Sequence, residues 1–352
     1  MKKLDFILVR TVVFFLLINS TDFVSAQTLI NRPNTYINSN CNGYVEFLPS
    51  TYNTNSDSYP LLIFVHGNSQ WGPGTNASLQ IVRDLGPNYW ANVFLDPNNH
   101  WLDFPGRHDL NKMVMISPQF VGPSAYDGPP SPAHINSVID YACNNYRIDR
   151  SRIYVCGPSY GGKWTLEYAA AYPYRVAAIV PFAAAVWSIQ GWADTFASTN
   201  LPIWMVNNLY DPIVGAGITQ VWIAAINNPT PPIVPPTPRA HASYPVGTYP
   251  LGYDHEYDYN YRGLDTATNG LNKNMYKWML QYSRANYFLG GAGSAWENAN
   301  NWSYNQVPNA NTDVIINTGP VIINSNASCK KITLKPGVNL TVNTGYKLTV
   351  TQ

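Results

Sequence analysis

Short, continuous runs of apolar residues alternate with helix-compatible segments between about residues 59 and 284. Runs without alternation are typical of strands that are covered on both faces. The five runs are "LLIFVHG" (61–67), "MVMISPQ" (113–119), "IYVCG" (153–157), "AAIVPFA" (177–183) and "PIWMVNN" (202–208). The segments 135–145, 161–171 and 276–284 fit helices. This order predicts an α/β fold with a doubly wound, mainly parallel sheet and right-handed crossovers.

Two stretches depart from this pattern. Residues 227–241, "NNPTPPIVPPTPRAH", are too rich in proline for a helix or sheet interior, and we expect a stiff surface excursion. Residues 287–352 contain short alternating runs such as "VIIN", "KITL" and "KLTV", separated by Asn, Gly and Pro turns. They predict a small β-rich accessory module, which we expect to be incomplete or to need a partner surface. In composition it resembles the repeat-like β modules of secreted Bacteroidota enzymes.

The N-terminal segment has the features of a secretory signal. Lys2, Lys3 and Arg10 precede the apolar stretch 11–18, and small residues at 24–26 fit a cleavage site. We therefore expect residues 1–26 to be a signal peptide, 27–286 the α/β domain, and the mature protein to be secreted or periplasmic. No later segment reaches the roughly 20 apolar residues of a membrane span.

Charge and cysteine content narrow the possible partners. Charged residues make up 12% of the chain and the net charge is +1, so we expect no nucleic-acid partner. The four cysteines allow three complete disulfide pairings, which the sequence does not rank. One disulfide or a set of buried thiols is the expectation. Their wide spacing does not indicate a metal site.

The stretch "YVCGPSYGGKW" (154–164) carries the main chemical signal. Gly157 to Gly161 match G-x-S-x-G, the turn that holds a nucleophilic serine between a strand and a helix. Strand and helix approach closely there, so the flanking positions need residues without side chains. The match follows an apolar run and begins a helical segment, which is the required order. Ser159 is therefore the predicted nucleophile, with a simple helix N-cap as the alternative.

A serine nucleophile needs a base and an acidic residue that orients the base. In α/β folds with a G-x-S-x-G turn between a strand and a helix, the acid and then the histidine follow the serine in the chain. Asp211 follows the apolar run 202–208 and is the predicted acid. His255 and His241 are the histidines after Ser159, and we favour His255 as the base because His241 lies in the proline-rich excursion.

Two backbone amides are expected to bind the oxyanion that forms during acyl transfer. The amide of Tyr160 directly follows the nucleophile. The second comes from the loop after "LLIFVHG", where Asn68 follows the His66–Gly67 pair. We interpret His66 as a structural residue of that loop.

Together these segments resemble the α/β-hydrolase superfamily over roughly residues 59–284. The likeness is closest to secreted esterases and peptidases near the dienelactone hydrolase, feruloyl esterase and polyhydroxybutyrate depolymerase branches. The resemblance implies acyl transfer by Ser159, His255 and Asp211, without a metal or an organic cofactor. It implies a carboxylic ester as substrate, including feruloyl or acetyl esters of plant polysaccharide.

Several side chains are predicted to contact that substrate. Trp71, Trp187, Trp192 and Gln119 lie in or near segments that can rim the site, as does Trp222. Aromatic walls suit a phenolic ester or a sugar-linked acyl group. Two other functions stay open: a serine peptidase with the same triad, and a catalytically degenerate protein that binds carbohydrate or a cell surface through the C-terminal module.

Overall fold

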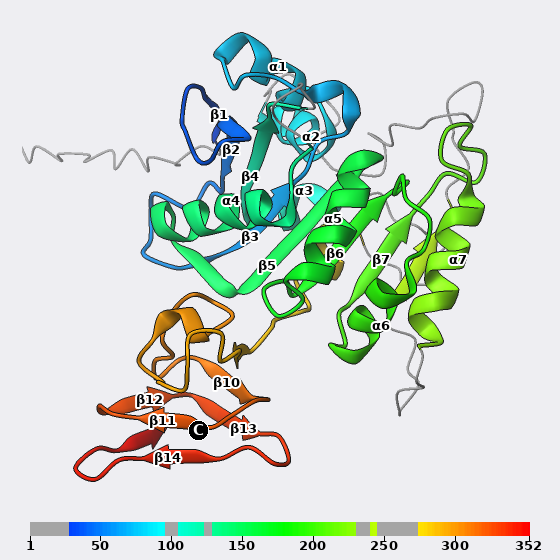
Figure 1. Cartoon of the computed structure of the whole chain (residues 1–352). Coiled ribbons are helices and arrows are strands. Elements are labelled where there is room, and N and C mark those ends of the chain that lie inside the picture. Colours follow the sequence, from blue (N-terminus) through cyan, green and yellow to red (C-terminus); the bar gives the residue numbers. More distant parts are fainter. Residues whose placement is uncertain (1–27, 96–104, 123–128, 230–239, 245–273) are drawn as a thin grey trace, which may run out of the picture.

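The computed structural model describes residues 28–95, 105–122, 129–229, 240–244 and 274–352. An eight-stranded sheet lies at the centre of the α/β domain (residues 28–285), in the order β1-β2-β4-β3-β5-β6-β7-β8 (Figure 1). β1 and β2 pair antiparallel, as do β2 and β4, and the remaining pairs are parallel. The strands are β1 Thr28–Arg32, β2 Cys41–Leu48, β3 Tyr59–Phe64, β4 Val114–Phe120, β5 Ile148–Pro158, β6 Ala178–Phe182, β7 Ile203–Val206 and β8 Ala240–Ser243.

These strands confirm the predicted fold class and all five apolar runs. They also extend the sheet by β1 and β2 at one edge and by β8 at the other. β8 shows that the expected surface excursion is wrong for its last two residues, Ala240 and His241, which lie in a strand beside β7. The helix expected over residues 276–284 is shorter than predicted and ends at Met279.

Helices cover both faces of the sheet, because alternate residues of the central strands point to opposite sides. Leu61 and Ile63 of β3 pack in one core with α4, α5, α6 and α7, whereas Leu62 and Phe64 pack in a second core with α1, α2, α3 and α9. The helices are α1 Asn76–Arg83, α2 Gly86–Leu95, α3 Pro105–Leu110, α4 Pro132–Asn145, α5 Tyr160–Ala171, α6 Gln190–Ser198, α7 Ala216–Asn227 and α9 Met275–Met279, with short 3₁₀ helices at η1 Asn68–Gln70 and η2 Ala299–Asn301.

Local sequence signals fix where α4 begins. Ser131 is its N-cap and receives a hydrogen bond from the backbone N–H of His134, while the His134 side chain accepts one from the backbone of Ser131. Pro132 fills the first helical position, where a missing N–H costs nothing. Within the described ranges, no helix combines the length and apolar composition needed to cross a bilayer.

The β module (residues 286–352) has a core of its own, built around Trp296, Trp302 and Val314. Its strands are β9 Asn286–Phe288, β10 Asp313–Ile316, β11 Val321–Ile323, β12 Ala327–Cys329, β13 Lys331–Leu334, β14 Leu340–Val342 and β15 Leu348–Val350. β10, β11 and β12 pair in parallel with β13, β14 and β15 respectively. This repeat is that of two successive coils of a β-solenoid.

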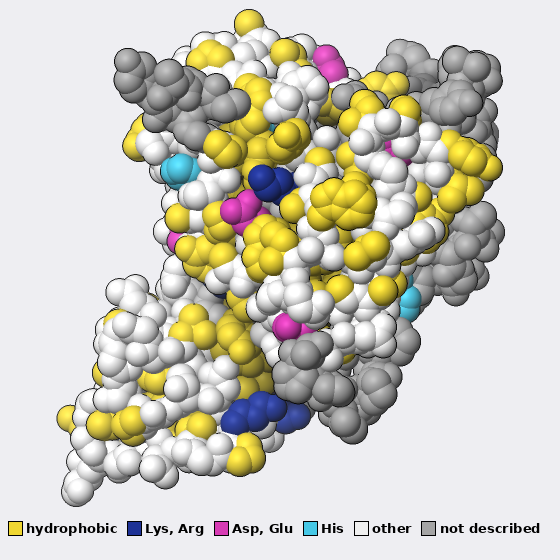
Figure 2. Space-filling view, turned by 45° about the vertical axis from the view of Figure 1, so that its right-hand side comes forward, with side chains coloured by type: hydrophobic (Ala, Val, Ile, Leu, Met, Phe, Trp, Pro, Cys, Tyr) yellow, Lys and Arg dark blue, Asp and Glu magenta, His cyan; other side chains and the backbone are white. Residues whose placement is uncertain are grey.

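The structure confirms a small C-terminal β module, and the division of the chain at residue 286 stays a prediction. Figure 2 shows hydrophobic side chains over much of the visible surface, with few charged ones between them.

All four cysteines are buried free thiols, which matches the second of the two alternatives left open by the sequence. Burial raises the pKa of the Cys41 thiol to about 12.

Candidate active site

Ser159 lies in a strained turn between β5 and α5. Its φ of +55° and ψ of −117° are rare for a residue with a side chain, and such a conformation costs about 1–3 kcal/mol. A Cβ added to Gly157 or Gly161 would lie 2.2 Å or 2.0 Å from the carbonyl oxygen of Val65. Both positions therefore require glycine, as the G-x-S-x-G spacing predicts.

Backbone hydrogen bonds hold this turn in place. The N–H of Ser159 donates to the carbonyl of Phe182 at 2.9 Å, at the end of β6. The carbonyl of Ser159 accepts from the N–H of Lys163 at 3.0 Å and of Ala185 at 3.1 Å. Hydrogen bonds to the end of β6, to the segment after it and to α5 therefore hold the backbone of Ser159 in its strained conformation.

The loop after β3 lies against the same turn. A Cβ on Gly67 would be 3.8 Å from the Cβ of Ser159, and one on Gly161 would be 2.7 Å from the carbonyl oxygen of His66. This loop carries Asn68, while Tyr160 begins α5, where backbone N–H groups have no partner within the helix. The structure thus brings together the two segments that hold the predicted oxyanion donors, and the role of each amide stays a prediction.

His66 fastens this loop to the neighbouring strand. Its ring is fully buried, Nε2 accepts the N–H of Phe120 at 3.0 Å, and Nδ1 lies 2.7 Å from the carbonyl of Gly67. Because Nε2 accepts, Nδ1 carries the proton and donates to Gly67. Burial lowers the pKa of His66 to about 4, so the ring stays neutral near pH 7. His66 is a structural residue of the loop, as expected from the sequence.

Asp211 follows β7 and is buried. Its Oδ1 accepts the N–H groups of Ile213 at 2.8 Å and Val214 at 2.9 Å. β7 lies two strands from β5 in the sheet, which corresponds to about 10 Å at the usual strand spacing. An imidazole between Asp211 and Ser159 is needed to join them. The predicted base, His255, lies outside the described residues.

The alternative histidine, His241, lies within a strand and not in a loop at the sheet edge. It lies in β8, paired with Trp204 of β7, two residues before the strand ends at Ser243. β8 is three strands from β5, or about 14 Å away across the sheet. Its ring is half-buried, and this burial lowers its pKa. The geometry therefore disfavours His241 as the partner of Ser159.

The two modules of the chain differ in what they resemble. Residues 287–352 match a protein family described as a domain of unknown function (DUF8693). A comparison with curated protein sequences gives no match.

Among solved structures, a thermostable esterase is similar to this chain at 18% sequence identity with a TM-score of 0.50, covering 74% of this chain and 64% of that one. The chain has the α/β-hydrolase fold. A ferulic acid esterase is also similar, at 13% sequence identity with a TM-score of 0.45, covering 62% of this chain and 91% of that one. FphF, a fluorophosphonate-binding serine hydrolase of Staphylococcus aureus, is similar at 14% identity with a TM-score of 0.48, covering 72% of this chain and 99% of that one.

Two of the predicted substrate-binding tryptophans lie close to the turn of this α/β-hydrolase domain. Trp71 is half-buried and packs its ring against Trp164 at 5.0 Å, and Trp164 in turn packs against Tyr160 at 5.7 Å. Trp187 follows Ala185, whose N–H bonds to Ser159, and is 66% exposed. Trp187 is therefore largely exposed two residues beyond a backbone contact with Ser159.

The other two predicted contacts point into the protein. Gln119 is fully buried: Oε1 accepts from the N–H of Gly74 at 3.1 Å and the Ser78 hydroxyl at 2.7 Å, while Nε2 donates to the carbonyls of Gln70 and Ser78. This amide fixes residues 70–78, from the end of η1 to the first turn of α1, and a contact with substrate stays only a prediction. Trp192 is half-buried and stacks on buried Trp222 at 6.3 Å.

Sequence reasoning missed further exposed apolar residues at the same edge of the sheet as the turn. Tyr210 is 55% exposed and Ile213 is 70% exposed, and both flank Asp211 in the loop after β7. Their position directly after a predicted strand was the available signal, because the carboxyl ends of parallel strands meet at one edge. Among the described residues, no group of three or more His, Cys, Asp or Glu side chains is arranged to hold a metal ion.

Proposed function

We propose that this chain is a serine esterase that hydrolyses carboxylic esters through Ser159. The observation that carries the proposal is the backbone conformation of Ser159, with φ at +55° between two glycines that nothing larger can replace. A strained non-glycine residue persists where surrounding structure enforces it, and such positions cluster at reactive sites. A simple N-cap serine has extended backbone and bonds to its helix, whereas the Ser159 side chain makes no cap hydrogen bond.

The mechanism is acyl transfer in two steps. His255 takes the proton of the Ser159 hydroxyl as Oγ bonds to the ester carbonyl carbon, and Asp211 steadies the resulting imidazolium. The alcohol then leaves with that proton. A water molecule, deprotonated by His255, releases the acid and restores the serine. The amides of Tyr160 and Asn68 bind the oxyanion in both steps.

Two exposed aromatic residues at the sheet edge that carries Ser159 favour an aromatic acyl group over acetate. Trp187 and Tyr210 are largely exposed on the loops after β6 and β7, and exposed aromatic rings beside a nucleophile suit a phenolic acyl chain. We therefore propose feruloyl-type esters of plant polysaccharide as the preferred substrates. The signal-like segment 1–26 supports export from the cell, which N-terminal sequencing of protein from the culture medium would test by finding Gln27 first.

The decisive experiment is an ester panel with single variants. We expect Ser159→Ala and His255→Ala to lower hydrolysis of an aryl acetate and a methyl ferulate by at least about a thousandfold. His241→Ala should keep the rate within a few fold. Far-UV circular dichroism of each variant controls for folding. Loss of activity in His241→Ala alone would overturn the assignment of the base.

A second measurement separates esterase from peptidase. Wild-type protein is expected to hydrolyse aryl esters and feruloyl esters faster than peptide anilides, and acetylated xylan more slowly than feruloylated substrates. Faster cleavage of anilides would identify a peptidase with the same nucleophile. A Ser159→Ala protein with unchanged activity towards every substrate would exclude both.

A further inference from the structure

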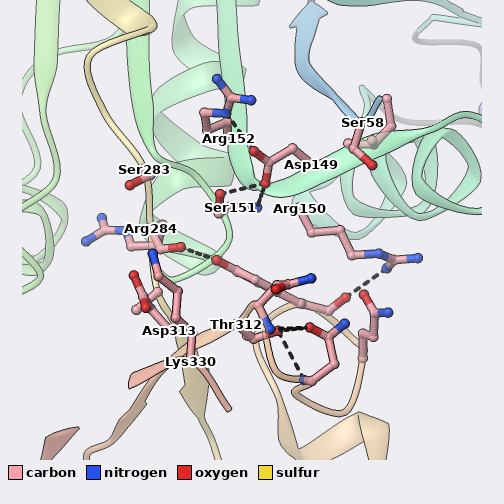
Figure 3. A pocket seen from close by; sticks show the side chains of 16 residues that line it. Ser58, Asp149, Arg150, Ser151, Arg152, Ser283, Arg284, Thr312, Asp313 and Lys330 are labelled. Carbon is pink, nitrogen blue, oxygen red and sulfur yellow. Dashed lines mark hydrogen bonds and ion pairs between the residues drawn. The ribbon is translucent and has the colours of Figure 1, made fainter. Parts of the chain in front are cut away.

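A groove of about 560 Å³ lies between the α/β domain and the β module (Figure 3). We call it the junction groove. Its walls come from the beginning of β5 together with Ser58, from residues 283–285, and from module positions between Tyr304 and Lys330. The two walls belong to different parts of the chain, so the groove exists only while they stay together.

Several contacts hold these walls in place. Nη1 of Arg150 donates to the carbonyl of Tyr304 at 2.9 Å, and the Tyr304 hydroxyl donates to the carbonyl of Arg284. The N–H of Arg284 donates to the carbonyl of Ser151 at 2.8 Å. Near the groove, the rings of Tyr174 and Tyr287 pack across the junction at 4.3 Å. The groove is therefore a built feature of the fold.

Positive charge exceeds negative charge in the lining. The lining includes four cationic residues, Arg150, Arg152, Arg284 and Lys330, and two carboxylates, Asp149 and Asp313. The guanidinium groups of Arg150 and Arg284 donate to backbone carbonyls, so their charges act from within the walls. Asp149 is engaged by Arg152, whose Nε lies 2.6 Å from Oδ2. Arg152 and Asp149 lie on one side of the cavity in Figure 3, with Lys330 and Asp313 on the other. A net positive groove attracts an anionic ligand.

The rest of the lining is rich in amide and hydroxyl groups. These come from the β module at Gln306, Asn309, Asn311 and Thr312 and from the α/β domain at Ser58 and Ser283. Pockets for drug-like ligands are mostly apolar, so this lining suits a hydrophilic ligand with many hydrogen-bonding groups. Hydroxyl groups and carboxylates occur together on acidic sugars. We propose that the junction groove binds an acidic oligosaccharide, with uronate carboxylates near Lys330 and Arg152.

This site is separate from the one that holds Ser159. β5 begins in the groove at Ile148 and ends next to the serine at Pro158. Eleven strand residues span roughly 35 Å at about 3.3 Å each. A short ligand in the groove therefore leaves the serine free, whereas a long polysaccharide can be held at one site while its ester groups reach the other. The proposal goes beyond ester hydrolysis and does not depend on it.

The test is a binding titration of the full-length chain with hexagalacturonate, which carries no ester. We expect measurable affinity at low salt, weakening as salt is added, because exposed charges are screened. Lys330→Ala should weaken binding at least about fivefold, and Lys330→Glu more. The matched control is Lys347→Ala, an exposed lysine of the same module that does not line the groove. It should change the affinity less than twofold.

Two comparison polymers distinguish recognition of an acidic sugar from binding of any sugar or any polyanion. Neutral xylohexaose and single-stranded DNA of similar length should bind at least about tenfold more weakly than hexagalacturonate. Absence of hexagalacturonate binding, equal binding of either comparison polymer, or equal effects of Lys330→Ala and Lys347→Ala would each overturn the proposal. Ser159→Ala should leave binding unchanged and Lys330→Ala should leave aryl ester hydrolysis unchanged, so failure here is distinguishable from failure of the proposed esterase activity.

Discussion

The two ends of β5 carry different kinds of structure. At the elbow end, Gly157 to Gly161, the backbone turns sharply around Ser159, and two glycines touch the carbonyl of Val65. At the module end, Ile148 to Arg152, the strand has ordinary backbone and its polar side chains make the contacts, including the Arg152–Asp149 ion pair. One end therefore depends on where backbone atoms lie, and the other depends on which side chains are present.

This difference predicts different tolerance to change. A partly exposed ion pair such as Arg152–Asp149 contributes at most about 1 kcal/mol, and another polar contact can replace it. At the elbow end, Val65 directly follows β3 and bonds to Cys156 of β5, so its backbone cannot move away from the two glycines without breaking the β3–β5 pairing. A substitution at the elbow end should therefore lower the free energy of unfolding much more than a substitution of similar size at the module end.

The largest effect is expected for Gly161→Ala. The new Cβ would lie 2.0 Å from the carbonyl oxygen of Val65, and backbone on both sides prevents relief. We expect a loss of about 4 kcal/mol or more in the free energy of unfolding, together with loss of ester hydrolysis. Urea denaturation at pH 7 measures the first and an aryl acetate assay the second.

Gly217→Ala is the matched control. Gly217 lies in the first turn of α7 with nothing within 4 Å of its added Cβ, so alanine should stabilise by about 0.5 kcal/mol through its higher helix propensity. If Gly161→Ala proved as mild as Gly217→Ala, the elbow end would not be the tightly packed region described above.

Much of the fold followed from sequence because parallel strands covered on both faces are continuous apolar runs. β2 was missed because its pattern is broken by Glu46, which is buried and bonds to Arg32 and to the Tyr146 hydroxyl. A carboxylate in the middle of an apolar run normally indicates a solvent-exposed position. Here the arginine and tyrosine, distant in sequence, make the carboxylate compatible with burial. β8 was missed because it is short and follows a proline-rich stretch.

The candidate site shows the same limit. Gly157, Ser159 and Gly161 were predictable because they form a pattern within five residues, although the backbone that excludes a side chain at both glycines is that of the distant Val65. Gln119 was not, because a polar side chain at a strand end looks the same whether it faces a ligand or a loop. Its four hydrogen bonds to residues 70–78 depend on tertiary structure. The parallel coils of the β module were hidden for a similar reason, since alternation does not reveal pairing partners.

The second largest effect is expected from acid, which should lower the free energy of unfolding through His66, in the loop that packs against the elbow end. His66 has its pKa lowered from 6.5 to about 4 by burial, so the unfolded chain takes up a proton more readily than the folded one. The stability from its neutral ring is complete above pH 6.5 and falls as the pH drops towards 4, by about 3 kcal/mol in all. Urea denaturation at pH 7, 5.5 and 4 measures this slope.

The variant His66→Gln removes the titrating group. We expect it to start from lower stability at pH 7 but to lose about 3 kcal/mol less than the wild type on acidification. His108→Gln, at an exposed histidine of α3, is the control for replacing a histidine with glutamine. An unchanged slope in His66→Gln would mean that acid acts on the protein elsewhere.

The smallest effect compares the same two substitutions at the two ends of β5. In Ser159→Gly the strain at φ +55° is relieved, so this variant should be about 1–2 kcal/mol more stable than Ser159→Ala, although both lack the hydroxyl. Ser151 lies in β5 at the module end, outside the positive-φ residues. There the order should reverse, with Ser151→Ala about 0.5–1 kcal/mol more stable than Ser151→Gly, because glycine loses more backbone freedom on folding. Thermal and urea denaturation of the four variants give both differences. The same order at both positions would remove backbone strain as the feature that distinguishes the elbow end.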